Sequence, residues 1–152
     1  MSAGGLEILG AVGAAVGLAG QVIATIHWLT KGVEDWKSKY TDLYDLYAMS
    51  TALKSSLDET DRMARNDAFV AVLKKDTGRR HALAMTIEAC NNVLNRAHQA
   101  LGTLTQLAGS NKLKQLGKSC EAFLKTDANK DLIQRISQYE NLLHVKRVEV
   151  LK

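Results

Sequence analysis

The feature that most constrains this chain is an uncharged apolar stretch near its start, from Ile8 to Thr30. It reads ILGAVGAAVGLAGQVIATIHWLT, with Glu7 before it and Lys31 after it. As a helix it would span roughly 35 Å at about 1.5 Å per residue, close to the thickness of the hydrocarbon core of a bilayer. A helix that is apolar on every side is buried in a protein core or in a membrane. We therefore expect a helix over Leu6–Leu29 in one of these two environments.

Four glycines interrupt this stretch: Gly10, Gly13, Gly17 and Gly20. Glycine costs a helix in water roughly 1 kcal/mol per site relative to alanine, so their number indicates a benefit from small size. That benefit is close backbone approach, either to other helices of a core or to copies of the same helix in lipid. Three interpretations stay open: the buried central helix of a soluble bundle, a membrane-active segment stored in a soluble resting state, and a permanent transmembrane anchor.

The remainder of the chain predicts an all-α fold. Proline is absent, and no sustained alternation of β-branched residues indicates a strand. The 152 residues are enough for one domain with a sizeable core. We expect a single domain over residues 1–152, a bundle of about five helices (four long, one short) around the Gly/Ala-rich first helix. The further helices are expected over Val33–Leu57, Arg62–Lys75, Leu83–Ala108, Lys112–Leu124 and from Asp127 to about Val148.

Apolar seams at alternating spacings of three and four residues support these helices. The clearest seam comprises Leu83, Ile87, Cys90, Leu94, Ala97, Leu101, Leu104 and Ala108. Shorter ones comprise Leu113, Leu116, Cys120 and Phe123, and then Leu132, Ile136, Tyr139 and Leu143. The second helix carries Trp36, Tyr40, Leu43, Tyr44 and Tyr47, which would be either core residues or an aromatic belt at a membrane interface.

The charged residues and the cysteines limit the compartment and the partners. Cys90 and Cys120 lie on apolar seams without a CxxC motif, which favours a reducing compartment. The net charge of +4 is too small to indicate nucleic-acid binding, and no arginine-rich run is present. Basic residues gather instead around an expected turn at Asp76–Gly78, where they would suit the surface of an anionic membrane. They are Lys74, Lys75, Arg79 and Arg80.

Signals of catalysis or metal binding are weak. The four histidines, His27, His81, His98 and His144, show no HxxxH or HExxH spacing. The segment DANKD at Asp127–Asp131 resembles the start of a calcium loop, but Leu132 replaces the required glycine and the closing glutamate is missing. We therefore expect no enzymatic activity, no metal and no cofactor.

The segment MSAGGLEILGAVGAAVGLAGQVIATI, followed by an aromatic-bearing second helix, resembles the fungal HeLo and HeLo-like (HELL-type) cell-death domains. These domains in turn resemble the N-terminal four-helix bundle of the necroptosis pseudokinase. The resemblance implies a pore-forming domain that executes programmed cell death, as in heterokaryon incompatibility and fungal immunity. Such a domain is cytoplasmic at rest, oligomerises when triggered, and then inserts its first helix into the plasma membrane. The resemblance also implies a trigger module or receptor outside this chain, with residues 1–152 as the N-terminal domain of a longer protein.

The resemblance leads us to expect two kinds of partner, anionic membrane lipids and further copies of the chain, and not nucleic acid. The residues expected to insert lie along the first helix: Leu6, Ile8, Leu9, Gly10, Val12, Gly13, Val16, Gly17, Leu18, Gly20, Val22, Ile23 and Ile26. The alternative is a non-enzymatic helical adaptor or oligomerisation module. It would bind a partner protein through the seam of the Leu83–Ala108 helix and through the acidic second helix.

Overall fold

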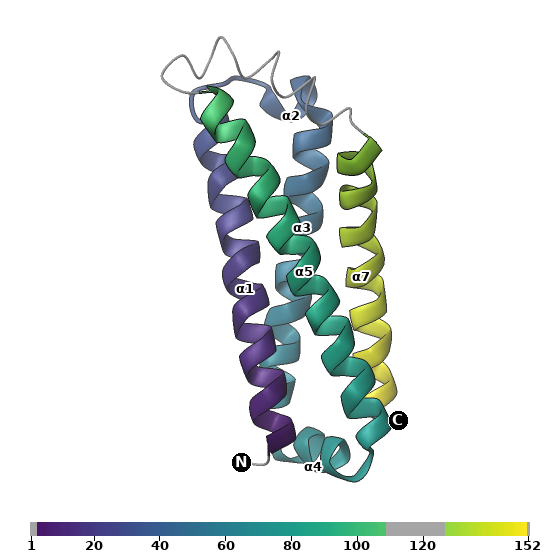
Figure 1. The fold of residues 1–152 in the computed structure, drawn as a ribbon. Helices are drawn as coiled ribbons and strands as arrows, with labels where there is room; N and C mark the ends of the chain where they lie inside the picture. Colours follow the sequence, from purple (N-terminus) through teal and green to yellow (C-terminus); the bar gives the residue numbers. More distant parts are fainter. Residues whose placement is uncertain (1–2, 109–126, 152) are drawn as a thin grey trace.

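Six helices make up nearly all of the residues that the structure describes, 3–108 and 127–151 in a computed structural model (Figure 1). They are α1 (Ala3–Thr30), α2 (Trp36–Lys39), α3 (Thr41–Ala64), α4 (Asp67–Lys75), α5 (Thr77–Ala108) and α7 (Asp127–Leu151). The predicted all-α fold class is confirmed, and no strand occurs in these ranges. The helix expected over 112–124 lies outside the described residues.

The four long helices, α1, α3, α5 and α7, run alternately up and down the bundle (Figure 1). Both α1 and α7 pack on α3 and on α5, so α1 and α7 occupy opposite corners. Short α4 crosses the end of the bundle at which α1 begins, and α2 lies at the other end (Figure 1). The connections between the first three long helices, residues 31–40 and 65–76, contain the short helices α2 and α4, which close the two ends of the bundle.

The core follows the predicted apolar seams. On α5, six of the predicted residues are buried: Leu83, Ile87, Cys90, Leu94, Ala97 and Leu101. On α7, Leu132, Ile136 and Leu143 are buried, and Tyr139 packs half-buried against them. The seam predictions are confirmed for these side chains. The side chains of Leu104 and Ala108, and the predicted seam within 109–126 with its Cys120, lie outside what the structure describes.

The predicted second helix is divided in two. It breaks at Tyr40, whose backbone (φ −120°, ψ 67°) ends α2 and precedes α3. Helix α3 then continues to Ala64, past the predicted end at Leu57, because Leu57, Thr60 and Ala64 carry its buried face onward. Trp36, Tyr40 and Tyr47 support the core interpretation, since they are half-buried against the core and the ring centroids of Trp36 and Tyr47 lie 5.8 Å apart, whereas Tyr44 is exposed.

Side-chain caps set the bounds of α4 and α5. The Oδ1 atom of Asn66 accepts hydrogen bonds from the backbone nitrogens of Ala68 (2.9 Å) and Phe69 (3.3 Å), so α4 begins only at Asp67. The expected turn over Asp76–Gly78 shrinks to Asp76 alone. Its Oδ1 accepts from the backbone nitrogen of Arg79 at 3.0 Å, which lets α5 begin directly at Thr77.

Candidate functional site: the outward face of the first helix

Helix α1 is a corner of the bundle, whereas its all-round apolar sequence favoured a central position. Its inward stripe is fully buried: Ile8, Val12, Ala15, Ala19, Val22, Ile26 and Leu29. Ile8–Thr30 is long and apolar enough to cross a membrane, with a mean hydropathy of 1.8. Yet only 28% of the residues in its most apolar window are buried, whereas the core helix of a soluble protein is mostly buried. The buried share of α1 is low because α3 and α5 cover only one side of the helix.

The other side of α1 is an exposed strip of small residues. We define the outward face of α1 as the exposed residues Gly10, Gly13, Ala14, Gly17, Gln21, Ala24 and Trp28. A Cβ atom added at Gly10, Gly13, Gly17 or Gly20 would meet no described atom within 4 Å. The described part of the bundle therefore makes no use of the small size of these glycines.

The residues predicted to insert are distributed around the whole of α1. Ile8, Val12, Val22 and Ile26 are buried against α3 and α5. Leu9, Val16, Leu18, Gly20 and Ile23 lie at the flanks and are half-buried, and Gly10, Gly13 and Gly17 are exposed. Leu6 lies within α1, and its side chain is outside the description. Every inward residue on this list would have to leave α3 and α5 before it could meet lipid.

The four basic residues predicted to meet a membrane surface lie at the end of the bundle where α1 begins (Figure 1). Lys74 and Lys75 are exposed in the last turn of α4, which contacts α1. Arg79 and Arg80 are half-buried in the first turn of α5, where Arg79 pairs with Asp76 at 3.2 Å (Nε to Oδ2). The fold thus brings the beginning of the apolar helix and positive charge to the same end.

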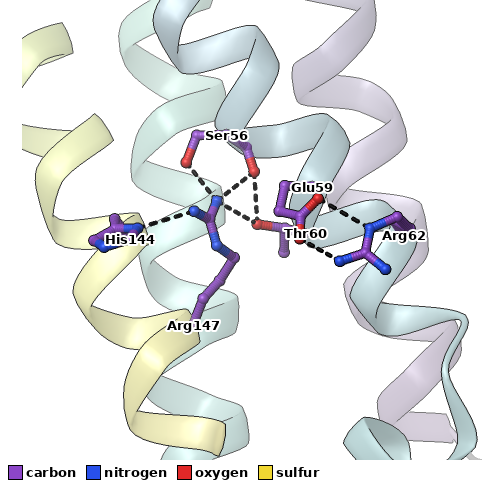
Figure 2. Close-up of polar contacts among 6 residues, drawn as sticks. All are labelled: Ser56, Glu59, Thr60, Arg62, His144 and Arg147. Atoms are coloured by element: carbon purple, nitrogen blue, oxygen red, sulfur yellow. Dashed lines mark hydrogen bonds and ion pairs between the residues drawn. The ribbon is translucent and has the colours of Figure 1, made fainter.

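Sequence reasoning missed the charged group in the described core, Arg147 of α7, which is 8% exposed (Figure 2). Its Nη1 donates to the carbonyl of Ser56 at 2.6 Å, to the Ser56 hydroxyl, and to Oγ1 of Thr60 at 3.4 Å. Its Nη2 donates to Nδ1 of His144 at 3.1 Å. We call Arg147, Ser56, Thr60 and His144 the Arg147 layer. The signal was available, since Arg147 continues the spacing of the buried Leu143 and Val150.

The geometry offers little for catalysis in the described ranges. No group of three or more His, Cys, Asp or Glu side chains there could hold a metal ion. Cys90 is fully buried, and burial raises the pKa of its thiol to about 12, so the thiol is neutral at pH 7.

Two surfaces were expected to bind a partner in the adaptor alternative, the apolar seam of α5 and the acidic second helix. The apolar seam of α5 faces the core, so it is not free for a partner. Among the acids of α3, those beyond Leu57 pair with bases of the same helix (Lys54 with Asp58, Arg62 with Glu59, Arg65 with Asp61), whereas Asp45, within the predicted second helix, is exposed. An unpredicted apolar strip is exposed on α7 instead, formed by Leu142 (40%), Val145 (48%) and Val148 (38%).

With this geometry in view, comparison of the chain with protein-family models, curated proteins and solved structures finds no match. The assignment of a function therefore depends on the residues and their arrangement.

Proposed function

We propose that this chain is a membrane-permeabilising helical domain that acts as HeLo-like cell-death domains do. At rest it is a cytoplasmic bundle, and on activation α1 leaves the bundle and inserts into the plasma membrane together with α1 from other copies. The observation that carries the proposal is the outward face of α1, where a Cβ atom at Gly10, Gly13 or Gly17, in the uncharged stretch Ile8–Thr30, would meet no described atom within 4 Å.

The glycines of α1 weaken the resting bundle but favour a state in which the helix lies in a membrane. In the bundle each exposed glycine weakens α1 by roughly 1 kcal/mol relative to alanine and gains no packing against the described residues in return. In lipid, where no hydrophobic effect drives helices together, small residues permit the close backbone contact that holds helices to one another. Gly13 and Gly17 have the GxxxG spacing for such contact. The glycines therefore support a second state in which copies of α1 meet in a membrane.

The basic residues at the end of the bundle where α1 begins supply a first contact with lipid. Lys74 and Lys75 are exposed there, and each basic group near an anionic surface contributes about 1 kcal/mol. This attraction would bring the beginning of α1 to the headgroups. Anionic lipid is accordingly the proposed partner, together with further copies of the chain.

The decisive test is leakage of dye from anionic vesicles with Gly13→Leu plus Gly17→Leu. No described atom lies near either position, so the variant should fold, and we expect its leakage rate to fall about tenfold or more because leucine separates the helices. Gly13→Ala plus Gly17→Ala raises helix propensity similarly while staying small, so it should leak well above the leucine pair.

A matched control adds the same bulk elsewhere. Ala48 and Ala52 are exposed small residues of α3 with the same spacing of four. Ala48→Leu plus Ala52→Leu should leak like the parent. Equal leakage from the two leucine variants and the parent would show that close packing of α1 has no role.

An adaptor function remains a second candidate because of the exposed strip Leu142, Val145 and Val148 on α7. Apolar residues at this spacing can seat a partner helix. An adaptor should not co-sediment with anionic vesicles. The membrane proposal expects co-sedimentation that weakens strongly in Lys74→Glu plus Lys75→Glu and stays unchanged in Lys37→Glu plus Lys39→Glu, an exposed pair at the opposite end.

A further inference from the structure

The buried stripe of α7 contains a charged residue, whereas the buried polar residues of the other described helices are uncharged serines and threonines. Arg147 lies between the buried Leu143 and Val150, and its guanidinium reaches across to two turns of α3 (Figure 2). Its four acceptors are one carbonyl, two hydroxyls and one imidazole nitrogen, and none of them is a carboxylate.

A buried guanidinium with fixed hydrogen-bond partners favours one position of α7 along α3. Burial lowers the pKa of Arg147, opposed by Glu59 and Glu140, yet the side chain stays charged at neutral pH because the ordinary pKa of arginine is so high. A buried cation is tolerated only where its donors are satisfied. Sliding α7 by one turn, about 5.4 Å, would carry Arg147 away from Ser56 and Thr60 and leave it unsatisfied.

Helix α1 is attached differently. Its inward stripe meets α3 and α5 through aliphatic side chains, with the small Ala15 and Ala19 at its middle. The hydroxyls of Thr25 and Thr30 bond to carbonyls of α1 itself, at 2.8 Å in each case. Beyond α1 the chain turns through Gly32 (φ 81°) and Asp35 (φ 57°), both in the left-handed region. Because the side chains of this inward stripe are aliphatic throughout, α1 can separate from α3 and α5 without breaking a buried polar layer like that of Arg147.

We propose that the Arg147 layer is a clamp that fixes the register of α7 on α3 and keeps α3, α5 and α7 together when α1 departs. The first half of this statement concerns the bundle alone. The second half rests on the proposed function, because it describes what remains after α1 has entered the membrane. Arg147 is thus a positioning residue.

Hydrogen exchange of the 152-residue chain in solution tests the clamp without lipid. In the parent, amides of α1 should exchange about tenfold or more faster than amides of α7, through opening of α1 alone. Arg147→Met should raise the α7 rates until they equal the α1 rates. Arg135→Met is the matched control, since Arg135 is exposed on α7 and pairs only within its helix, with Asp131 at 2.7 Å. Equal rates for α1 and α7 in the parent, or no change in Arg147→Met, would overturn the clamp.

Spin-label distances on anionic vesicles test the remaining unit. Labels at exposed Gln21 and Ala52 report α1 against α3, and labels at Ala52 and exposed Asn141 report α3 against α7. These labels are placed in a Cys120→Ser protein, and Cys90 needs no substitution because it is buried and does not react with the label. The first distance should lengthen by more than a helix diameter, about 10 Å, and the second should stay single and unchanged.

The outcomes separate the two proposals. An α3–α7 distance that lengthens along with the α1–α3 distance overturns the clamp while leaving membrane insertion in place. Vesicles that never leak, with both distances unchanged, overturn the proposed function, and the exchange rates in solution still decide the clamp. In Arg147→Met on vesicles the α3–α7 distances should broaden, and an unchanged narrow distribution contradicts the role of Arg147.

Discussion

At the scale of a single residue, Cys90 links burial to pH. Burial raises the pKa of its thiol from 9.0 to about 12 in the folded chain. Below pH 9 the folded and unfolded chains both hold the proton, so this thiol adds no pH dependence. Between pH 9 and 12 the unfolded chain releases the proton and the folded chain keeps it, so the free energy of unfolding falls, by up to about 1.4 kcal/mol per pH unit.

The measurement is urea unfolding at several values between pH 8 and pH 11, comparing Cys120→Ser with Cys120→Ser plus Cys90→Ala. Lysines and tyrosines also titrate here, and subtracting the two profiles removes their contribution. We expect the stability advantage of the Cys90 protein to shrink as the pH rises. Parallel profiles would show that the thiol is not held in a low-dielectric core.

At the scale of one element, replacing glycines in α1 and just after it is expected to change the free energy of unfolding in opposite directions. Gly13→Ala plus Gly17→Ala should raise the free energy of unfolding by about 1 kcal/mol per site, since a Cβ meets nothing there. Gly32→Ala, just after α1, should lower it by about 1–2 kcal/mol because Gly32 has a φ of 81°. Thermal unfolding followed by circular dichroism checks both. A destabilised alanine pair would mean that the outward face of α1 is packed in the resting state.

Individual elements also show how far sequence reasoning reached. The seam on α5 was predictable, because apolar residues in a polar helix mark its buried side. Helix α1 has no polar side to mark what faces solvent, so its corner position could not be read from its sequence. The break at Tyr40 has no proline or glycine signal, and it places Trp36 beside Tyr47, a contact between α2 and α3 that spacing alone does not reveal. Arg147 was missed because a charged residue is normally a surface residue.

At the scale of the whole molecule, the proposed function is a competition between two environments for α1. Shortening a buried isoleucine to alanine costs the bundle about 2–5 kcal/mol. The same change in a membrane loses only about half a kcal/mol of insertion energy. Ile26, fully buried on the inward stripe of α1, should therefore hold α1 in the bundle more strongly than it favours lipid.

Ile26→Ala is accordingly expected to unfold more easily and, at equal protein concentration, to release dye from anionic vesicles faster than the parent. Ile136 of α7 provides the comparison, because it is also a fully buried isoleucine and α7 lies at the corner opposite α1. Ile136→Ala should lose a similar free energy of unfolding without the gain in leakage, since α1 keeps its contacts. Should both variants leak faster to the same degree, general loosening of the bundle would explain permeabilisation, and selective release of α1 would not.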